Sequence, residues 1–247
     1  MKTHRMYLKE LSNSSSTYEL DSIQSLHIAT VLRLKEGATI ELFNGEGLTC
    51  KANILLASKR GVQIELNSKI TKSEKSKGTL IGVLPYIKKE NLFFMTQKLT
   101  EMGISELIFF KPENLDQSLV KKDLSKLKDK LNDVVIGACK QSGINFLPKI
   151  EHHNDLKESL DNSSALEANN FVCFFDLEAS KHLSRDDITD KEAWVFITGP
   201  ESGFSDQERF TMLAKDISLR SLGKNILRAE TAPIISITLF QSFLGNL

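Results

Sequence analysis

The sequence has little cysteine and no long apolar run, and each of these shortages excludes a class of protein. Its three cysteines, Cys50, Cys139 and Cys173, lie far apart and form no CxxC pair, so neither a disulfide framework nor a zinc site is predicted. No apolar stretch approaches the roughly 20 residues that cross a bilayer, and residues 1–15 contain no apolar core of signal-peptide length. We therefore expect a protein of the reducing cytoplasm, without metal or membrane contact.

The chain also lacks an excess of charge of either sign. Its 247 residues include 32 basic and 32 acidic side chains, so no overall field would draw it to nucleic acid. Residues 1–77 carry 12 basic and 8 acidic side chains, a net charge of +4, whereas the remainder carries 20 and 24, a net charge of −4. Phosphate contacts are therefore expected to be local and to come mainly from the front part.

The hydrophobic pattern changes once along the chain. Before residue 70, short and partly alternating apolar stretches indicate a compact β-rich module, with one helix expected near residues 21–32. Residues 71–78, TKSEKSKG, are charged and lack large apolar groups, which is typical of a linker. After them, apolar runs of strand length alternate with helical stripes, which predicts a mostly parallel sheet covered on both faces. The predicted domains are therefore 1–70 and 79–247, the second of class α/β.

Apolar residues at helical spacing mark the helices of the second domain. Two stripes each end before a glycine, Gly103 or Gly143; they consist of Leu92, Met95, Leu99 and Met102, and of Leu124, Leu127, Leu131, Val134 and Ala138. A last helix is predicted to have Thr231 as its cap and Pro233 in its first turn. This helix is apolar nearly all round, so we expect it to be buried or shared with a second subunit.

Residues 197–208, ITGPESGFSDQE, join an apolar strand to a helix through two glycines and a proline. Ser205 and Glu208 have the spacing of a capping box, so the helix is expected to begin there. Open α/β sheets bind ligands at the carboxyl ends of their strands, and Gly199 and Gly203 permit close backbone approach. An ordinary strand-to-helix turn remains the alternative. The spacing matches neither GxGxxG nor GxxxxGK[ST], which disfavours a dinucleotide or a triphosphate.

A second unusual loop, SLGKNILRAETAP, spans residues 221–233. Gly223 ends the preceding apolar run, and Asn225 suits a turn. Arg228 and Glu230 flank Ala229 just before the last helix. Their residue types alone indicate a surface ion pair and an acid at a helix terminus, worth about 1 kcal/mol or less.

Together the two loops resemble those of the RsmE family, SPOUT-class methyltransferases that methylate N3 of a uridine in small-subunit, 16S ribosomal RNA. The segments HRMYL, HIATVLRLKEGATIELFNGEG, QKLTEMGISEL and ACKQSGINFLP follow the family's order, so the resemblance spans essentially the whole chain. It implies an N-terminal PUA-like β-barrel that binds RNA and a SPOUT-type α/β domain with a C-terminal trefoil knot. It also implies S-adenosylmethionine as cofactor and a homodimer formed through the C-terminal helix.

The resemblance further implies roles for individual residues. Cofactor contacts are expected from Leu177, Thr198, Gly199, Glu201, Gly203, Leu222, Gly223, Asn225, Ile226, Leu227, Arg228 and Ala229. Arg228 is the first candidate for stabilising the uracil anion, and Glu230 is the second, for organising that site. The candidate phosphate contacts of the front domain are Arg5, Arg33, Lys35, Lys59 and Arg60, with Lys72, Lys75 and Lys77 in the linker; for each, a solvated surface charge is the alternative.

The chain departs from the family pattern where relatives often carry two arginines, because it has Asn114 and Ile144 there. Three functions therefore remain open. The first is an active ribosomal RNA uridine-N3 methyltransferase, acting on naked RNA or on an assembled subunit. The second is a non-catalytic or retargeted RNA-binding relative in ribosome assembly. The third is a nucleotide-dependent enzyme on an ordinary α/β sheet, which the missing phosphate loops disfavour.

Overall fold

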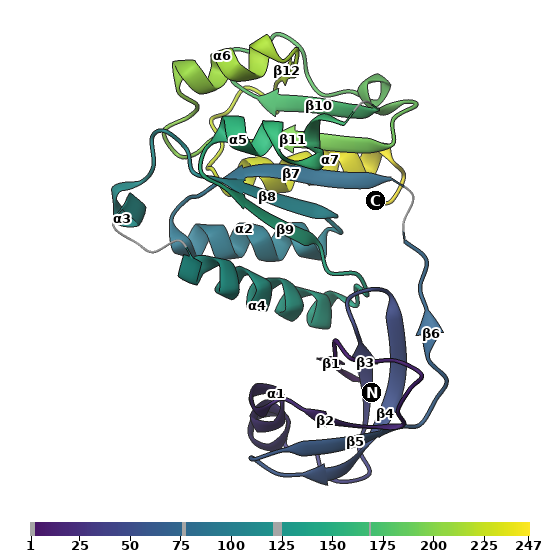
Figure 1. The fold of residues 1–247 in the computed structure, drawn as a ribbon. Helices are drawn as coiled ribbons and strands as arrows, with labels where there is room; N and C mark the ends of the chain where they lie inside the picture. The colour runs from purple at the N-terminus through teal and green to yellow at the C-terminus, as the bar shows by residue number, and fades with distance from the viewer. Residues whose placement is uncertain (1–2, 76–77, 121–124, 168) are drawn as a thin grey trace. The chain divides into compact units, whose positions relative to one another are not determined.

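The computed structural model describes residues 3–75, 78–120, 125–167 and 169–247, and the chain divides into two compact units (Figure 1). The first unit contains residues 1–75 together with 139–147, and the second contains 76–138 and 148–247. A short stretch from the middle of the chain therefore folds with the N-terminal residues. The sequence pattern gave no indication of this return.

The first unit is built on a sheet whose strands follow the order β1-β3-β4-β5-β2, with β6 paired to β4. Its strands are β1 His4–Tyr7, β2 Thr17–Leu20, β3 Thr39–Phe43, β4 Leu48–Ala57, β5 Val62–Leu66 and β6 Thr71–Lys72. Alternation places the core: in β5, Val62 and Ile64 are buried, whereas Gln63 and Glu65 are exposed. Because β6 pairs with β4, the stretch that resembles a linker begins as part of this sheet.

The helix expected near residues 21–32 is present in two parts. Helix α1, Ser22–Leu26, begins after Asp21, whose carboxylate accepts a hydrogen bond from the Gln24 N–H at 2.8 Å. It continues as a π-helical stretch, His27–Leu32, and ends at Arg33, which adopts the left-handed conformation with φ of 52°.

The returning segment packs against two turn glycines of the first unit. A Cβ at Gly45 would lie 2.6 Å from the Leu147 side chain, and one at Gly47 would lie 2.5 Å from the Phe146 ring. Both glycines have positive φ, so the turn NGEG needs glycine for its backbone shape and for this close approach. The sequence shows the turn but not what packs on it.

Arg5 lies inside the first unit rather than on its surface. Its side chain is 8% exposed, Nε donates to Glu41 Oε1 at 2.9 Å, and Nη1 donates to the Cys139 carbonyl at 2.7 Å. Nη2 also donates to Asn145 Oδ1. These contacts argue against the predicted phosphate contact by Arg5, because the returning segment covers its guanidinium and occupies most of its donors. Arg5 instead ties β1 to β3 and to that segment.

The sheet of the second unit is entirely parallel, in the order β12-β10-β11-β7-β8-β9 within the described residues. Its strands are β7 Thr79–Pro85, β8 Glu106–Phe110, β9 Lys149–His153, β10 Asn170–Phe175, β11 Ala193–Ile197 and β12 Ser218–Arg220. The prediction of a mostly parallel sheet in an α/β domain is thus confirmed. It fits the continuous burial of β7 and β11.

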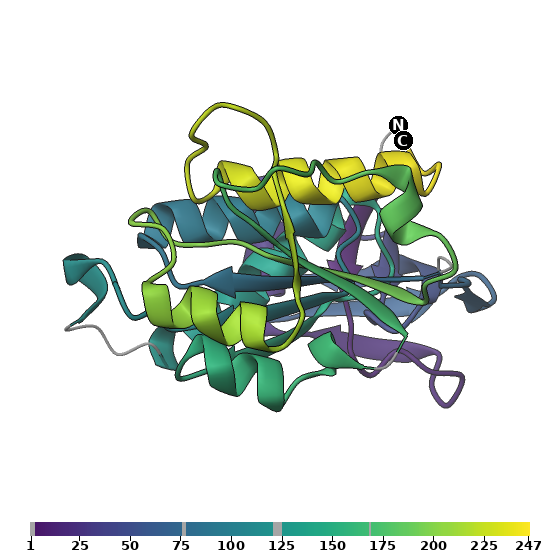
Figure 2. The ribbon, with the colours of Figure 1, turned by 90° about the horizontal axis from the view of Figure 1, so that it is seen from above.

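Helices cover both faces of this sheet (Figure 2). Helices α2, Lys89–Glu101, and α7, Thr231–Phe243, lie side by side on one face, where Phe240 stacks on Phe196 of β11 at 6.2 Å between ring centroids. Helices α5, Leu156–Asp161, and α6, Asp206–Ala214, cover the opposite face, where Leu160 and Met212 join the core around Val83. Within the described chain, no helix has the length and apolarity that crossing a membrane requires.

Further helices occur between β8 and β11 along the described chain. They are α3, Gln117–Val120, α4, Ser125–Ser142, and two short 3₁₀ turns, Ser164–Leu166 and Arg185–Ile188. The buried stripe of α4 contains Val135 rather than the Val134 that was predicted, because the helix phase turns the latter partly outward. Leu124 lies outside the described residues.

The final helix differs from its prediction at its start. Thr231 is the first residue of α7 rather than its cap, and Glu230 occupies the cap position without a side-chain hydrogen bond to the helix. Two hydrogen bonds, from the N–H groups of Thr231 and Ala232 to the Arg228 carbonyl, form the first turn instead. Pro233 lies in that turn, as predicted, where no N–H is needed.

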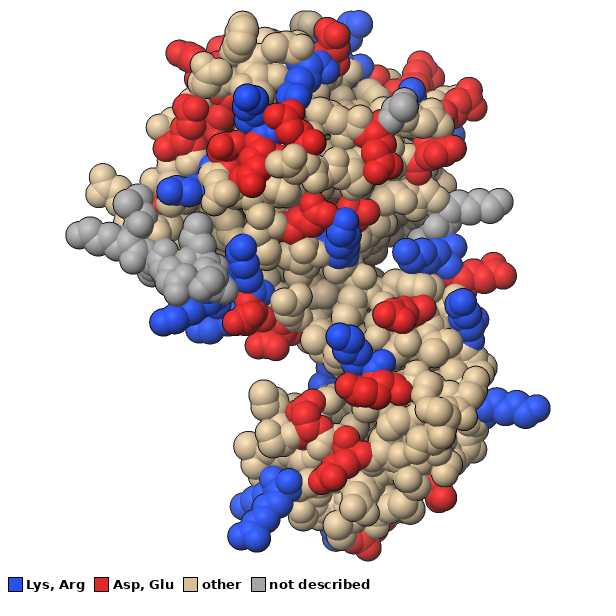
Figure 3. Space-filling model, in the orientation of Figure 1, with Lys and Arg blue, Asp and Glu red and all other residues tan. Residues whose placement is uncertain are grey.

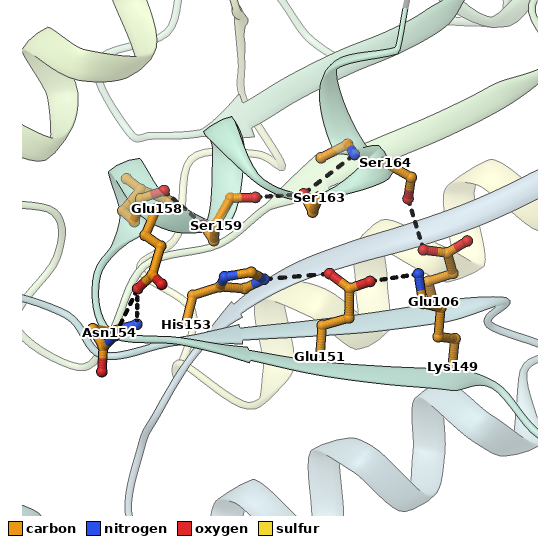
Figure 4. Close-up of polar contacts among 11 residues, drawn as sticks. Glu106, Lys149, Glu151, His153, Asn154, Glu158, Ser159, Ser163 and Ser164 are labelled. Atoms are coloured by element: carbon orange, nitrogen blue, oxygen red, sulfur yellow. Dashed lines mark hydrogen bonds and ion pairs between the residues drawn. The ribbon is translucent and has the colours of Figure 1, made fainter.

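Strand β9 is an edge strand that the apolar pattern did not indicate. Lys149, Glu151 and His153 alternate along one of its faces, with Lys149 Nζ 2.5 Å from Glu151 Oε1 and His153 Nε2 3.3 Å from Glu151 Oε2 (Figure 4). Charged side chains along an edge disfavour pairing with a second chain. The same charges make KIEHH resemble a surface loop in the sequence.

The structural role of Arg5 is testable by mutation. We expect Arg5→Met to lower the free energy of unfolding by about 2 kcal/mol, because the Glu41 carboxylate would lose its partner and the Cys139 carbonyl would keep only one of its two donors. Arg60→Met, at an exposed arginine of the same unit, is the matched control and should change it by less than about 0.5 kcal/mol. Urea unfolding followed by circular dichroism measures both. Equal, small changes would contradict the assignment.

Candidate functional site

A pocket of about 210 Å³ lies where loops from the carboxyl ends of adjacent strands meet. The three loops follow β12, β10 and β11, which are neighbours in the sheet. The carboxyl ends of parallel strands lie at one edge, which is where open α/β sheets bind ligands. The pocket is lined by Phe175, Asp176, Leu177, Gly199, Pro200, Glu201, Gly203, Phe204, Arg209, Leu222, Gly223, Asn225, Ile226, Leu227, Ala229 and Ala232.

The loop after β11 is shaped by a capping box and by a tight turn. The predicted box is confirmed: Ser205 Oγ accepts from the Glu208 N–H at 3.0 Å, and Glu208 Oε2 accepts from the Ser205 N–H at 2.9 Å. Glu208 is buried and its other oxygen accepts from the Glu113 N–H at 3.2 Å, so it also holds the loop after β8. Gly203, with φ of 76°, donates to the Pro200 carbonyl and closes the turn.

The loop after β12 leaves its main chain free for a ligand. Gly223 has φ of 126°, and the Ser221 hydroxyl bonds both to its N–H and to its carbonyl at 3.1 Å. Within the part of the chain that is described, no hydrogen bond of the protein engages the main-chain N–H groups of residues 225–229. Ala229 is only 5% exposed. Buried N–H groups are nearly always paired, so the Ala229 N–H calls for an acceptor from a ligand. Residues 225, 226 and 228 are exposed, so their N–H groups are open to water or to a ligand.

An unpaired hydroxyl lies beside the same pocket. Thr198 follows β11 directly and precedes the pocket-lining Gly199, and its Oγ1 is buried without a hydrogen-bond partner among the described residues. Its main-chain N–H, by contrast, donates to the Val83 carbonyl at 3.2 Å. A buried hydroxyl without a partner costs free energy unless a ligand or water completes it.

The structure brings most of the predicted cofactor residues together. All except Thr198 and Arg228 line the pocket. Leu177 lies two residues beyond the end of β10. Sequence reasoning missed the charged lining residues Asp176 and Arg209; Asp176 could have been found beside Leu177, but nothing in the pattern of α6 marks Arg209.

Arg228 and Glu230 lie next to the pocket in different environments. The Arg228 side chain is 84% exposed, whereas that of Glu230 is 11% exposed at the start of α7, where the helix dipole favours a carboxylate. Arg228 Nη1 is 3.9 Å from Glu230 Oε1, a weak contact at this exposure. Arg228 itself does not line the pocket, although its neighbours Leu227 and Ala229 do, and its guanidinium is exposed to solvent.

The remaining candidates for phosphate contact are solvent-exposed side chains. Acidic and basic residues are interspersed on the face drawn in Figure 3. Exposure suits a phosphate contact but does not establish one; the exposed candidates are Arg33, Lys35, Lys59, Arg60, Lys72 and Lys75, while Lys77 lies outside the described residues.

The two positions that depart from the family pattern have local roles. The Asn114 carbonyl accepts from the Ser202 hydroxyl at 3.4 Å, so it lies against the loop after β11. The Ile144 carbonyl accepts from Arg5 Nη1 at 3.4 Å within the first unit. No group of three or more His, Cys, Asp or Glu side chains in the described residues could hold a metal ion.

Comparison with known proteins identifies the class to which this fold and pocket belong. A model described as an RNA methyltransferase domain matches residues 73–241, and one described as an RNA methyltransferase PUA domain matches residues 21–67. The chain is therefore an RNA methyltransferase with a mixed α/β fold and a PUA-like N-terminal domain.

Individual relatives narrow this class. The chain is 31% identical to the ribosomal RNA small subunit methyltransferase E of Rickettsia conorii, over 96% of this chain and 94% of that protein. It also resembles the corresponding Neisseria gonorrhoeae enzyme bound to S-adenosyl methionine, with 26% identity, a TM-score of 0.86 and 98% of each chain covered. A Legionella pneumophila methyltransferase with bound SAM matches at 25% identity, a TM-score of 0.87 and 98% of each chain. The chain belongs to the ribosomal RNA small subunit methyltransferase E family.

The shape of the loop after β12 depends on Gly223. We expect Gly223→Ala to destabilise the protein by roughly 1–3 kcal/mol and to distort the pocket, because φ of 126° strains any residue with a Cβ. Gly137→Ala is the control, since Gly137 lies in α4 with no atom within 4 Å of its added Cβ; it should be neutral or stabilise by up to about 1 kcal/mol. Thermal unfolding measures both, and similar effects of the two substitutions would refute the argument.

Proposed function

We propose that the chain transfers a methyl group from S-adenosylmethionine to N3 of a uridine in 16S ribosomal RNA. The observation that carries the proposal is the pocket, where loops from three adjacent strands surround one volume and residues 225–229 offer unpaired main-chain N–H groups. Membership of the methyltransferase E family and the cofactor named for two similar structures support the same ligand.

The residues that line the pocket fit the chemical groups of this cofactor. Leu177, Leu222, Ile226 and Leu227 provide apolar surface for an adenine ring. Main-chain N–H groups suit its ring nitrogens and carboxylate, while the carboxylate of Glu201 and the Thr198 hydroxyl suit an ammonium group and ribose hydroxyls. Thr198 and Arg228 do not line the pocket themselves; we include them in the proposed cofactor site because Gly199, Leu227 and Ala229, next to them in the sequence, do.

The chemistry at N3 explains why no thiol is required. When bound, S-adenosylmethionine supplies a methyl group that a nucleophile can attack directly. N3 of uracil has a lone pair once its proton leaves, so the enzyme must align the reacting atoms and favour the anion. Burial raises the pKa of the Cys139 thiol to about 11 and also raises the pKa of Cys173, so neither is a thiolate near neutral pH.

Arg228 and Glu230 take complementary roles in this proposal. The Arg228 side chain is exposed and lies between two pocket-lining residues in the sequence, and in this proposal its guanidinium donates to the uracil oxygens that gain charge as N3 loses its proton. Glu230 is buried at the start of α7, where its carboxylate is the acidic group near the arginine and is proposed to organise the site.

Further features of the family are proposed for this chain. We infer that the sheet of the first unit closes into a barrel that grips RNA, and that the loop after β12 threads as part of a trefoil knot. Partly exposed apolar residues on α7, Ile234, Ile235, Leu239 and Phe243, support a homodimer through this helix. Residues 1–70 would then serve as the RNA-binding domain, 71–78 as the linker and 79–247 as the methyltransferase domain, in a cytoplasmic enzyme.

The role of Arg228 is tested by methyl transfer from labelled S-adenosylmethionine. Incubation with 16S RNA and with small subunits, followed by identification of the base, should give N3-methyluridine. We expect Arg228→Ala to reduce kcat/KM by at least about tenfold, or ~1.4 kcal/mol of transition-state binding, with unchanged unfolding.

Lys224→Ala, in the same loop, is the control and should remain close to the parent protein. Near-normal turnover of Arg228→Ala would remove Arg228 from the mechanism. Absence of transfer by the parent protein to either substrate, with retained RNA binding, would favour the non-catalytic assembly role that Asn114 and Ile144 leave open.

Phosphate contacts by the first unit are tested by a salt titration of RNA binding. Replacing Arg33, Lys35, Lys59 and Arg60 with glutamine should flatten the slope of log K against log salt by about 0.7 for each contact made to single-stranded RNA. The same number of glutamines at Lys130, Lys157, Lys191 and Lys215 in the second unit is the control. Identical slopes for both variants would argue against phosphate binding by the first unit.

A further inference from the structure

We propose that Arg209 is a positioning residue that braces the loop after β10 and holds Leu177 against the cofactor. The inference rests on the proposed function, because it concerns how tightly that pocket holds S-adenosylmethionine. It assigns a role to an ion-pair cluster, formed by Arg209, Asp176 and Glu178, that the catalytic argument does not use.

Arg209 forms ion pairs with two acidic residues of the loop after β10. Arg209 Nη2 is 2.8 Å from Asp176 Oδ2, and Arg209 Nη1 donates to Glu178 Oε2 at 3.1 Å. The two acids flank Leu177, which lines the pocket while 54% exposed. One guanidinium thus holds the residues before and after the apolar side chain that forms part of the wall.

The first contact is the stronger one. The Asp176 side chain is 9% exposed and that of Arg209 is 32% exposed, so this pair is screened far less than the contact with Glu178, which is 79% exposed. Asp176 Oδ1 also accepts from the Glu178 N–H at 3.0 Å, which bends the chain at Leu177. Both oxygens of Asp176 are therefore used to shape the loop.

Helix α6, which carries Arg209, is firmly held in the structure. Arg209 lies in the first turns of α6, which the capping box of Ser205 and Glu208 fixes to the loop after β11. Met212, one turn further, is fully buried. The ion pairs therefore tie the loop after β10, which carries the exposed Leu177, to the fixed start of α6. Without the tie, ordering this loop would cost conformational entropy on binding.

Lysine is a poor substitute for this arginine. A guanidinium presents donors in a planar fork that spans two carboxylates, whereas a single ammonium must choose between them. Arg209→Lys should therefore keep only part of the effect. This graded response separates a brace from a simple positive charge near the pocket.

The test measures cofactor affinity directly, by calorimetric titration of the whole protein with S-adenosylmethionine and, separately, S-adenosylhomocysteine. We expect Arg209→Gln to raise Kd by roughly threefold to tenfold, with a smaller rise for Arg209→Lys and a comparable one for Asp176→Asn. Arg185→Gln, an exposed arginine that does not line the pocket, is the matched control and should leave Kd unchanged.

A double-mutant cycle with Leu177→Ala identifies the mechanism. If Arg209 acts through Leu177, Arg209→Gln should cost much less affinity once the leucine is gone. An equal cost in both backgrounds would show that Arg209 contacts the cofactor itself or supports α6 generally, and would overturn the proposal. So would an unchanged Kd in Arg209→Gln with tight binding by the parent protein. Failure of the parent protein to bind either compound would instead refute the proposed function.

Discussion

The site depends on one constraint: three neighbouring parallel strands end at the same edge, and the chain must turn after each without filling the space between them. Glycine meets this constraint where a side chain would strain the backbone, with φ of 76° at Gly203 and 126° at Gly223. The capping box of Ser205 and Glu208 then fixes where α6 begins. The result is a pocket lined by residues of all three loops, with apolar side chains beside the main chain of the glycines.

Residue type and spacing along the sequence could predict those strands, helices and caps that depend on neighbouring residues alone. The apolar runs that became β7 and β11, the stripe of α2 and the capping box of α6 follow from residue type and spacing. The GPESG segment was predicted to be a ligand loop and four of its residues line the pocket, while the resemblance to a known family supplied the cofactor. Whether each assigned residue contacts that cofactor stays a prediction, although the structure gathers most of them around one pocket.

Features set by distant parts of the chain could not be predicted. Arg5 looks like a surface cation until Cys139 and its neighbours fold back over it. Strand β9 is charged because it is an edge, so it lacks the apolar signal of a strand. Arg209 is one charge on a helix surface in the sequence, and its importance appears once Asp176 stands 2.8 Å away. In each case a tertiary contact gives an ordinary polar residue its role.

The central claim is that the loops after β10, β11 and β12 close around one methyl donor. Hydrogen–deuterium exchange with and without S-adenosylmethionine tests it most directly, because binding should slow exchange of main-chain N–H groups that the protein leaves unpaired. We expect residues 175–178, 198–204 and 222–229 to become protected together, with no change at residues 58–61. Protection confined to one of these loops, or located elsewhere, would contradict it.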